Sequence, residues 1–352
     1  MLIRNKNHPQ LTYDSVLIAP NKVSDQKSRF NDSYCCPFTG FWYPSGSRLN
    51  YTPRLLPICT APMDTIASQG FLENSKGLYA VFSHRFQSIE DQLKDLHHGA
   101  QPVIGLNTDY IDILTLTRMA KHLLIDVANG GNLAVIELLK SLQDLRGKVK
   151  LWAGNVACAE TYKAIAPYCD YVRVGIGGGS ACLTRVNTGI GVGNITAIDD
   201  CYRARKKMEL FSFFRKHSLA QIVADGGIRN NGDICKALAA GADLVMIGSM
   251  FAGTDESCAE FSADGKHKLF KGMASQAAVD LMTPGKANVS IEGASGKIKR
   301  TGKLKDLLHS IEGNLRSSMT YVNAHNLAEF RRNANLYRVD SSVSIENHSH
   351  LL

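Results

Sequence analysis

Short hydrophobic runs alternate with amphipathic segments through the middle of the chain. Eight such runs, rich in β-branched residues or ending in Gly, Asp or Asn, begin at Pro57, Leu78, Pro102, His122, Val149, Tyr171, Gln221 and Leu244. Between most of them the apolar residues recur with helical spacing, as in residues 132–143 and 234–242. Near-continuous apolar strands that alternate with helices indicate a parallel sheet covered by helices. Eight strands favour a closed (β/α)8 TIM barrel over its rival, an open doubly wound sheet.

Polar side chains follow the predicted strands at similar places. Seven of them stand at or just beyond strand C-termini: Asp64, His84, Asn107, Asp126, Asn129, Asn155 and Asp225. One such residue would more often be a loop cap, but barrel enzymes assemble their sites at this face. The set therefore predicts a barrel with a site at the C-terminal ends of its strands.

Other segments interrupt the alternation, and we predict a single α/β domain that accommodates them. Its parts are an N-terminal extension (1–50), the barrel (51–271), a flap after strand eight (272–302), a helical segment (303–335) and a tail (336–352). A glycine-rich insertion at 178–203 follows strand six. An aromatic-rich stretch at 31–47 is expected to form a loop or hairpin that closes the barrel base.

Composition and charge narrow the class of protein. With 44% hydrophobic and 20% charged residues the chain resembles a soluble globular protein, and no apolar run nears the roughly 20 residues of a membrane span. The first residues contain no hydrophobic signal region, so we expect a cytoplasmic protein. The nine cysteines form no CxxC pair, which argues against a disulfide framework or a structural zinc site. The net charge of +8 comes from scattered basic residues, which suits small phosphorylated ligands rather than nucleic acid.

The segment 174–194, VGIGGGSACLTRVNTGIGVGN, carries the strongest chemical signal. Its glycines allow tight turns that aim N–H groups and carbonyls at a phosphate or a monovalent cation. Cys182 stands on this loop with Ser180, Thr184 and Arg185. A cysteine on an exposed loop beside a cation is placed to form a nucleophilic thiolate. The alternative, a buried inert thiol, suits the other eight cysteines better, because so glycine-rich a loop supplies no apolar pocket.

Five further motifs accompany this loop. They are APMDT from Ala61, IDVANG from Ile125, AGNV from Ala153, ADGGIR from Ala224 and KGMAS from Lys271. Over about residues 10–335 the chain resembles the IMP dehydrogenase/GMP reductase family. The resemblance implies that the Cys182 thiolate adds to C2 of a purine monophosphate and that hydride passes between C2 and a nicotinamide. It also implies a homotetramer.

The resemblance assigns roles to individual residues. Catalysis would fall to Cys182, Thr184 and Glu292. The substrate would be bound by Ser180, Asp225, Gly226, Gly227, Gly248, Ser249, Gly272, Met273, Ala274 and Ser275. The cofactor would contact Asp126, Ala128, Asn129, Gly130 and Asn155, with Arg85 near a 2′-phosphate, and a potassium ion would meet carbonyls of Gly177, Gly179 and Cys182. Alone, the segment 224–249 supports only a phosphate cradle between strands seven and eight.

Two enzymes of this family differ in the fate of the covalent adduct. A dehydrogenase hydrolyses it with an Arg-Tyr pair on the flap, but neither residue type occurs here between Ala274 and Ile291. A reductase needs a proton relay to expel ammonia, and Thr184 and Glu292 match that role. We therefore predict a GMP reductase-like enzyme that uses NADPH to convert GMP to IMP and ammonia through a Cys182 thioimidate.

Alternatives stay open at this point. GMP reductases are expected to carry proline at the position of Gly178, threonine at that of Leu183, and GMSS in place of GMAS. Because these differences lie around the expected substrate, a related purine monophosphate is a second substrate candidate. An IMP dehydrogenase that has no regulatory CBS module is another alternative. A purine-nucleotide-binding barrel without catalysis is the non-enzyme alternative.

Overall fold

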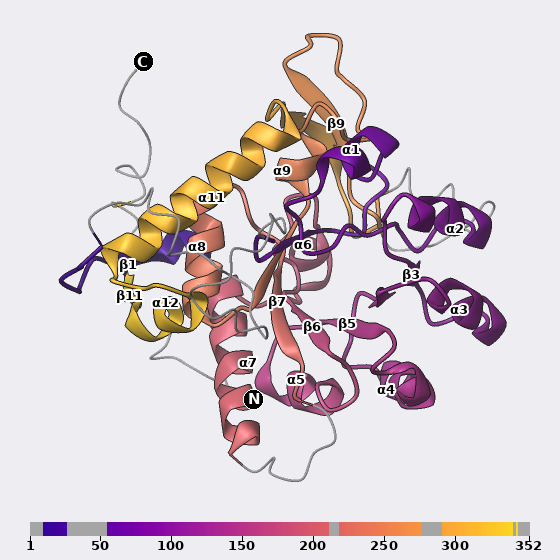
Figure 1. Ribbon diagram of the computed structural model, residues 1–352, viewed down its shortest axis with the longest axis horizontal. Coiled ribbons are helices and arrows are strands. Elements are labelled where there is room, and N and C mark those ends of the chain that lie inside the picture. The colour runs from indigo at the N-terminus through magenta and orange to yellow at the C-terminus, as the bar shows by residue number, and fades with distance from the viewer. Residues whose placement is uncertain (1–9, 27–54, 211–217, 276–290, 341–342, 344–352) are drawn as a thin grey trace, which may run out of the picture.

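The structure is a computed structural model that describes residues 10–26, 55–210, 218–275, 291–340 and 343 (Figure 1). Its centre is a parallel sheet of seven strands in the order β2-β8-β7-β6-β5-β4-β3. The strands are β2 (Ile58–Thr60), β3 (Val103–Ile104), β4 (His122–Asp126), β5 (Lys150–Val156), β6 (Tyr171–Val174), β7 (Gln221–Asp225) and β8 (Leu244–Ile247). Each strand falls within one of the predicted hydrophobic runs.

An eighth extended segment, residues 79–83, lies between β2 and β3. Parallel bridges join Cys59 to Ala80 on one side and Phe82 to Gln101 on the other. This segment belongs to the second predicted run, and its two bridges connect the two edges of the seven-stranded sheet. The predicted (β/α)8 fold is therefore confirmed.

Helices surround the strands on the outside of the ring. They are α1 (Gln69–Asn74), α2 (Ile89–His97), α3 (Tyr110–Thr117), α4 (Leu133–Ser141), α5 (Ala159–Ile165), α7 (Asn194–Glu209) and α8 (Asn231–Ala240), with a short 3-10 turn, η2 (Gln143–Leu145), after α4. Five of these helices begin at a side chain that accepts a hydrogen bond from the first turn: Ser68, Ser88, Asp109, Asn132 and Asn230. None of these caps belongs to the seven polar residues at strand ends, so helix capping does not account for that set.

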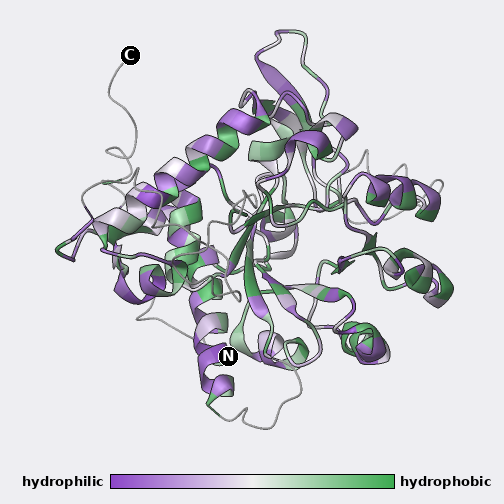
Figure 2. Cartoon of the chain, viewed as in Figure 1, coloured by the Kyte–Doolittle hydropathy of each residue, from purple (hydrophilic) through white to green (hydrophobic). Residues whose placement is uncertain are grey.

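The core lies between the strands and the inner faces of these helices. Figure 2 shows hydrophobic residues concentrated on the central strands and a mixture of hydrophobic and hydrophilic residues on the outer helices. Strands β6 and β8 are buried at every position, because one face meets the barrel interior and the other meets helices. This double burial explains why the strands appear in the sequence as apolar runs rather than as alternating patterns. One residue of β6, Arg173, is nevertheless charged.

Two segments that are far apart in the sequence pair in a second, small sheet. Strand β1 (Val16–Ala19), after the turn η1 (Tyr13–Ser15), pairs antiparallel with β11 (Asn335–Arg338). Helices α11 (Leu304–Tyr321) and α12 (Leu327–Asn333) precede β11 and pack on α8. The predicted helical segment thus contains two helices, and the predicted tail begins inside a strand. The aromatic-rich stretch at 31–47 lies outside the described residues.

A β-hairpin projects from the ring after β8 and the short helix α9 (Ser249–Ala252). Its strands are β9 (His267–Lys271) and β10 (Ser295–Lys299), which run antiparallel. The predicted barrel range, 51–271, includes β9, but β9 pairs with β10, a strand of the predicted flap. Near the ring, α6 (Thr184–Thr188) and the start of α7 fall inside the predicted insertion at 178–203. Among the described helices, none has the length and apolarity that crossing a membrane requires.

Candidate active site

A cavity of about 370 Å³ lies at the C-terminal ends of the barrel strands. The predicted site residues that line it come from loops after six strands and from the hairpin. They are Arg85, Asp126, Ala128, Asn155, Gly177, Gly179, Ser180, Cys182, Thr184, Asp225, Gly226, Gly227, Gly248, Ser249, Gly272, Met273, Ala274 and Glu292. Residues far apart in sequence thus meet at the barrel face that the strand-end pattern indicated.

The loop after β6 turns sharply beside β7 before it reaches Cys182. Gly175 has a φ of +145°, and a Cβ placed there would lie 2.0 Å from the carbonyl oxygen of Asp225. Only glycine fits so close an approach of two backbones. The glycine-rich sequence therefore allows the loop to cross the strand ends and to place its cysteine over the cavity.

Backbone bonds fix the cysteine end of this loop to the returning arm of the hairpin. Cys182 forms an antiparallel bridge with Gly293. On either side of the bridge, the N–H of Ala294 donates to the carbonyl of Ala181 at 2.8 Å, and the N–H of Leu183 donates to that of Glu292 at 2.8 Å. The position of Cys182 consequently depends on the hairpin as well as on the barrel.

A directed chain of hydrogen bonds runs from the cysteine to a carboxylate. The Cys182 thiol donates to the Thr184 hydroxyl at 3.2 Å, and that hydroxyl donates to Oε2 of Glu292 at 2.7 Å. Both bonds point the same way, so a proton that leaves sulfur can reach Glu292 through Thr184, and the reverse path can return it. This is the arrangement of a nucleophile with its base and a connecting hydroxyl.

Four other cysteines have environments that disfavour the thiolate. Cys59, Cys169, Cys201 and Cys235 are buried, and this burial raises the pKa of each thiol, that of Cys235 to about 11. Cys182 is half-buried and lines the cavity. The inert-thiol alternative thus describes these four cysteines and not Cys182.

A buried arginine organises the floor of the cavity. Arg173 is 6% exposed and donates to Oδ2 of Asp225 from Nε at 3.1 Å and from Nη2 at 2.8 Å, and it also pairs with Asp126. Burial lowers the pKa of this guanidinium, but the Asp225 and Asp126 carboxylates outweigh burial and hold its pKa above the ordinary value. Arg173 is not among the site residues predicted from the sequence. A charged residue inside an otherwise apolar strand was the available signal.

Two more predicted residues join this network. Nδ2 of Asn155 donates to Oδ2 of Asp225 at 2.6 Å and to the carbonyl of Gly175 at 2.9 Å. Nη1 of Arg85 donates to the backbone carbonyl of Asp126 at 2.8 Å. The Asp126 and Asp225 carboxylates therefore face the cavity from fixed orientations, each held by a cation.

The end of the cavity near β7 and β8 is built from backbone. Gly226 and Gly227 have φ of +91° and +76°, and Nδ2 of Asn194 donates to the carbonyl of Gly226 at 2.6 Å. Asn194 also lies against Gly178, where a Cβ would stand 2.3 Å from its Oδ1. This contact gives a physical reason for glycine at position 178: a proline or any other side chain there would collide with Asn194.

Comparison with known proteins agrees with this geometry. A family model described as "IMP dehydrogenase / GMP reductase domain" matches residues 86–350. The chain belongs to the IMP dehydrogenase/GMP reductase family. It is 35% identical over 323 residues to the inosine-5′-monophosphate dehydrogenase of Staphylococcus saprophyticus. This match covers 87% of this chain and 64% of that protein. It is 39% identical over 239 residues to the inosine-5′-monophosphate dehydrogenase of Staphylococcus aureus, which covers 65% of this chain and 47% of that protein.

The chain therefore spans about half to two-thirds of the length of the curated relatives it matches. Family membership is established by the family model, whose match begins just after the second barrel strand and covers most of the chain. The family relationship confirms the resemblance that the motifs indicated. The relatives also contain sequence that this chain does not match.

Three predicted site residues of this family member do not line the cavity. Ser275 is 1% exposed, and its N–H donates to the carbonyl of Gly272 at 3.0 Å. The Asn129 side chain accepts from the N–H of Gly131, and the N–H of Gly130 donates to the carbonyl of Asn155 at 2.7 Å. These residues shape the turns that carry their neighbours, and their contact with a ligand stays a prediction.

The predicted potassium site also stays a prediction. The carbonyl of Gly179 already accepts the N–H of Cys182 at 3.0 Å, so only its second lone pair is available for a cation. Within the described ranges, no group of three or more His, Cys, Asp or Glu side chains is arranged to hold a metal ion.

Proposed function

We propose that this protein is a purine-nucleotide oxidoreductase in which the sulfur of Cys182 bonds to C2 of the base. The observation that carries this proposal is the hydrogen-bonded chain from Cys182 through Thr184 to Glu292 at the wall of the cavity. A nucleotide-binding site requires no nucleophile with an attached proton path. The chain of donors therefore favours catalysis over the alternative of a binding barrel.

Different residues around the cavity would bind the phosphate, the ribose and the base of the substrate. Backbone N–H groups of Gly226, Gly227 and Gly248 suit a phosphate, since glycine turns and the start of a helix present donors to anions. Asp225 accepts its protein donors at Oδ2, which directs Oδ1 to ribose hydroxyls. Met273 then lies along the base, where the hairpin faces Cys182.

In this proposal a nicotinamide cofactor binds beside the base. Asp126, Ala128 and Asn155 line the wall next to the Cys182 loop, and Arg85 adds a cation for a phosphate group. When bound there, the cofactor would supply or accept a hydride at C2. The protein would hold the two rings together and exclude water from them.

The chain's own residues favour the reductive direction with GMP. Proton transfer from the Cys182 thiol through Thr184 to Glu292 leaves a thiolate, which forms a sulfur–C2 bond. The same path returns the proton to the 2-amino group, so that the C2–nitrogen bond breaks and ammonia leaves. Hydride addition to C2 and cleavage of the sulfur–C2 bond then release IMP and the thiolate. In the sequence, residues 275–290 contain neither the arginine nor the tyrosine that a water-activating flap would use.

The names of the relatives favour the oxidative direction. Both staphylococcal relatives are named inosine-5′-monophosphate dehydrogenase, and at 35% and 39% identity they support this alternative more directly than they support GMP reduction. In that direction the Cys182 thiolate adds to C2 of IMP, hydride leaves C2, and water cleaves the sulfur–C2 bond to give XMP. Glu292 and Thr184 would then take the proton from the attacking water.

Nicotinamide absorbance separates these directions. The protein and its Cys182→Ala variant are assayed with GMP plus NADPH or NADH, and with IMP plus NAD⁺ or NADP⁺. Loss of reduced cofactor with release of ammonia selects the reductase, and formation of reduced cofactor selects the dehydrogenase. In either case the alanine variant should be inactive. Nucleotide binding without turnover in any arm would refute the enzyme proposal and select a binding barrel.

Two further predictions accompany this function. A homotetramer and a potassium ion at the Cys182 loop follow from the family resemblance. Light scattering of the purified protein tests the first. Activity in potassium chloride against choline chloride at equal ionic strength tests the second, since choline cannot be coordinated by carbonyls at a tight loop.

A further inference from the structure

A buried lysine outside the cavity anchors the first strand of the hairpin, β9. Lys268 is 0% exposed, and its ammonium donates to the carbonyl of Thr254 at 2.6 Å, to the carbonyl of Ser257 at 3.2 Å and to Oγ of Ser257 at 2.7 Å. The ring of Phe261 lies below, with its centroid 4.7 Å from the nitrogen. In the part of the chain that the structure describes, no carboxylate forms an ion pair with this ammonium.

The lysine lies on the face of β9 that leads into the active site. Lys268, Phe270 and Gly272 are buried, whereas Leu269 and Lys271 between them are more exposed. Side chains alternate across a strand, so the side chains of Lys268 and Phe270 point the same way. Phe270 and Gly272 line the cavity. The ammonium therefore fixes the strand face that forms one wall of the site.

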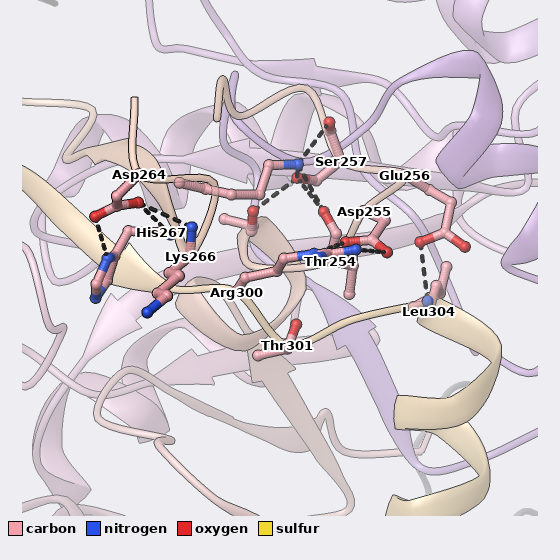
Figure 3. A network of polar contacts seen from close by, with 12 residues as sticks. Thr254, Asp255, Glu256, Ser257, Asp264, Lys266, His267, Arg300, Thr301 and Leu304 are labelled. Carbon is pink, nitrogen blue, oxygen red and sulfur yellow. Dashed lines mark hydrogen bonds and ion pairs between the residues drawn. The ribbon is translucent and has the colours of Figure 1, made fainter. Parts of the chain in front are cut away.

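The turn that accepts these bonds, residues 253–260, is anchored to the barrel on its other side. The N–H of Ala259 donates to the carbonyl of Thr65 at 3.1 Å, just beyond β2. The turn also holds the second hairpin strand, because Arg300 pairs with Asp255 through Nε at 2.6 Å and Nη2 at 2.8 Å (Figure 3). Both arms of the hairpin thus meet the barrel at one turn.

The chemistry of this contact suits positioning better than stabilisation alone. A buried ammonium is costly even when it is hydrogen-bonded, and an apolar side chain of similar length would fill the same space at lower cost. Burial accordingly lowers the pKa of Lys268, against the opposing influence of Asp255, Cys258 and Glu256, while Arg300 adds to the lowering. What an ammonium adds is three directed bonds that permit one register of β9 on the turn.

We propose that Lys268 is a positioning residue that locks the hairpin onto the turn at 253–260 and so holds Glu292 and Gly293 against Cys182. The effect of this contact on catalysis rests on the proposed function, but the attachment of the hairpin by Lys268 does not. If the hydrogen bonds from Lys268 to the turn are lost, the bridge from Cys182 to Gly293 and the hydrogen bond from Thr184 to Glu292 lose their support. Cys182 would then become more accessible while the barrel stays folded.

The test compares Lys268→Met with Lys297→Met, which removes an exposed lysine from the partner strand β10. Two readouts avoid turnover: amide hydrogen exchange of residues 268–275 and 291–299, and the rate at which iodoacetamide alkylates Cys182, followed by peptide mass spectrometry. We expect Lys268→Met to accelerate both by about tenfold or more, which corresponds to the loss of one or two buried hydrogen bonds. Exchange in β4 to β7 should change little, and Lys297→Met should match the parent.

A milder variant keeps the test decisive if Lys268→Met does not fold. Ser257→Ala removes one of the three acceptors and leaves the ammonium in place. Faster exchange confined to the hairpin, with faster alkylation of Cys182, supports the lock. Unchanged exchange and alkylation in the foldable variants, or acceleration spread evenly over hairpin and barrel, overturns it. Because neither readout needs a substrate, these results stand even if the parent protein proves inactive.

Discussion

Oε2 of Glu292 lies 2.7 Å from the Thr184 hydroxyl, although 108 residues separate the two in sequence. The contact joins the loop after β6 to the returning arm of the hairpin. Thr184 in turn lies 3.2 Å from the Cys182 sulfur. The reactive thiol and its proton acceptor are therefore carried by different parts of the fold, and the hairpin completes the site.

Removing the end of this proton path should slow catalysis without weakening binding. We expect Glu292→Gln to lower kcat by about 10² to 10⁴-fold, the usual contribution of a positioned acid or base. Nucleotide affinity measured by calorimetry should stay within a few-fold. Thr184→Val should have a similar effect, and the double variant should lose little more, because both changes interrupt one path. Additive losses in the double variant would show that the two residues act independently.

Breaking the buried charge network should destabilise the barrel. Arg173→Met leaves Asp126 and Asp225 facing each other across the cavity floor without a cation between them, and such a loss costs about 3–5 kcal/mol. The measurement is the free energy of unfolding from urea denaturation. Arg203→Met, which removes the exposed pair with Asp199, is the matched control and should change stability by less than about 1 kcal/mol. Equal losses in the two variants would contradict the account.

Adding a methyl group at Gly178 should disturb the end of the cavity near β7 and β8. The new Cβ would lie 2.3 Å from Oδ1 of Asn194, which is 6% exposed and is held by its hydrogen bond to the carbonyl of Gly226. We expect Gly178→Ala to cost about 1–3 kcal/mol and to weaken nucleotide binding. Asn194→Ser should restore part of the loss, which a double-mutant cycle measures. Gly313→Ala, in the middle of α11 with nothing within 4 Å of its Cβ, should instead stabilise the protein slightly. A Gly178→Ala protein as stable as the parent would show that Asn194 can move aside.

Much of this site could be predicted from sequence because its parts are local. The barrel strands are buried on both faces, so each leaves an apolar run, and the glycine-rich loop marks Cys182 by its composition. Arg173 could not be assigned in this way. Its partners Asp126 and Asp225 lie 47 and 52 residues away in the sequence, and only the pairing of β4 to β7 in one sheet brings these charges together. Lys268 was missed for a related reason, since an alternating strand with a lysine suggests a solvent-facing side chain rather than a buried one.

Acid should destabilise the opposite end of the barrel through one histidine. His122 is at the start of β4, where its Nδ1 accepts the indole N–H of Trp152 at 3.0 Å within a cluster that includes Tyr79 and Tyr171. Burial, with smaller contributions from Lys121 and Lys150, lowers its pKa from 6.5 to about 4.

The sign of the effect follows from this lowered pKa. Below pH 6.5 the unfolded chain binds a proton at His122 that the folded protein does not accept until the pH nears 4. The neutral imidazole therefore contributes its full share of stability above pH 6.5, and this contribution is lost as the pH falls toward 4. The total loss in the free energy of unfolding is about 3 kcal/mol. Burial lowers the pKa of His84 as well, so the parent protein alone cannot isolate His122.

The comparison with His122→Asn isolates it, because asparagine keeps an acceptor for Trp152 and does not titrate. Free energies of unfolding for both proteins are measured from pH 7.5 to pH 4.5. We expect the parent to lose about 2–3 kcal/mol more than the variant over this range. Parallel stability curves would mean that His122 has an ordinary pKa in the folded protein, and that the cluster around Trp152 opens to water.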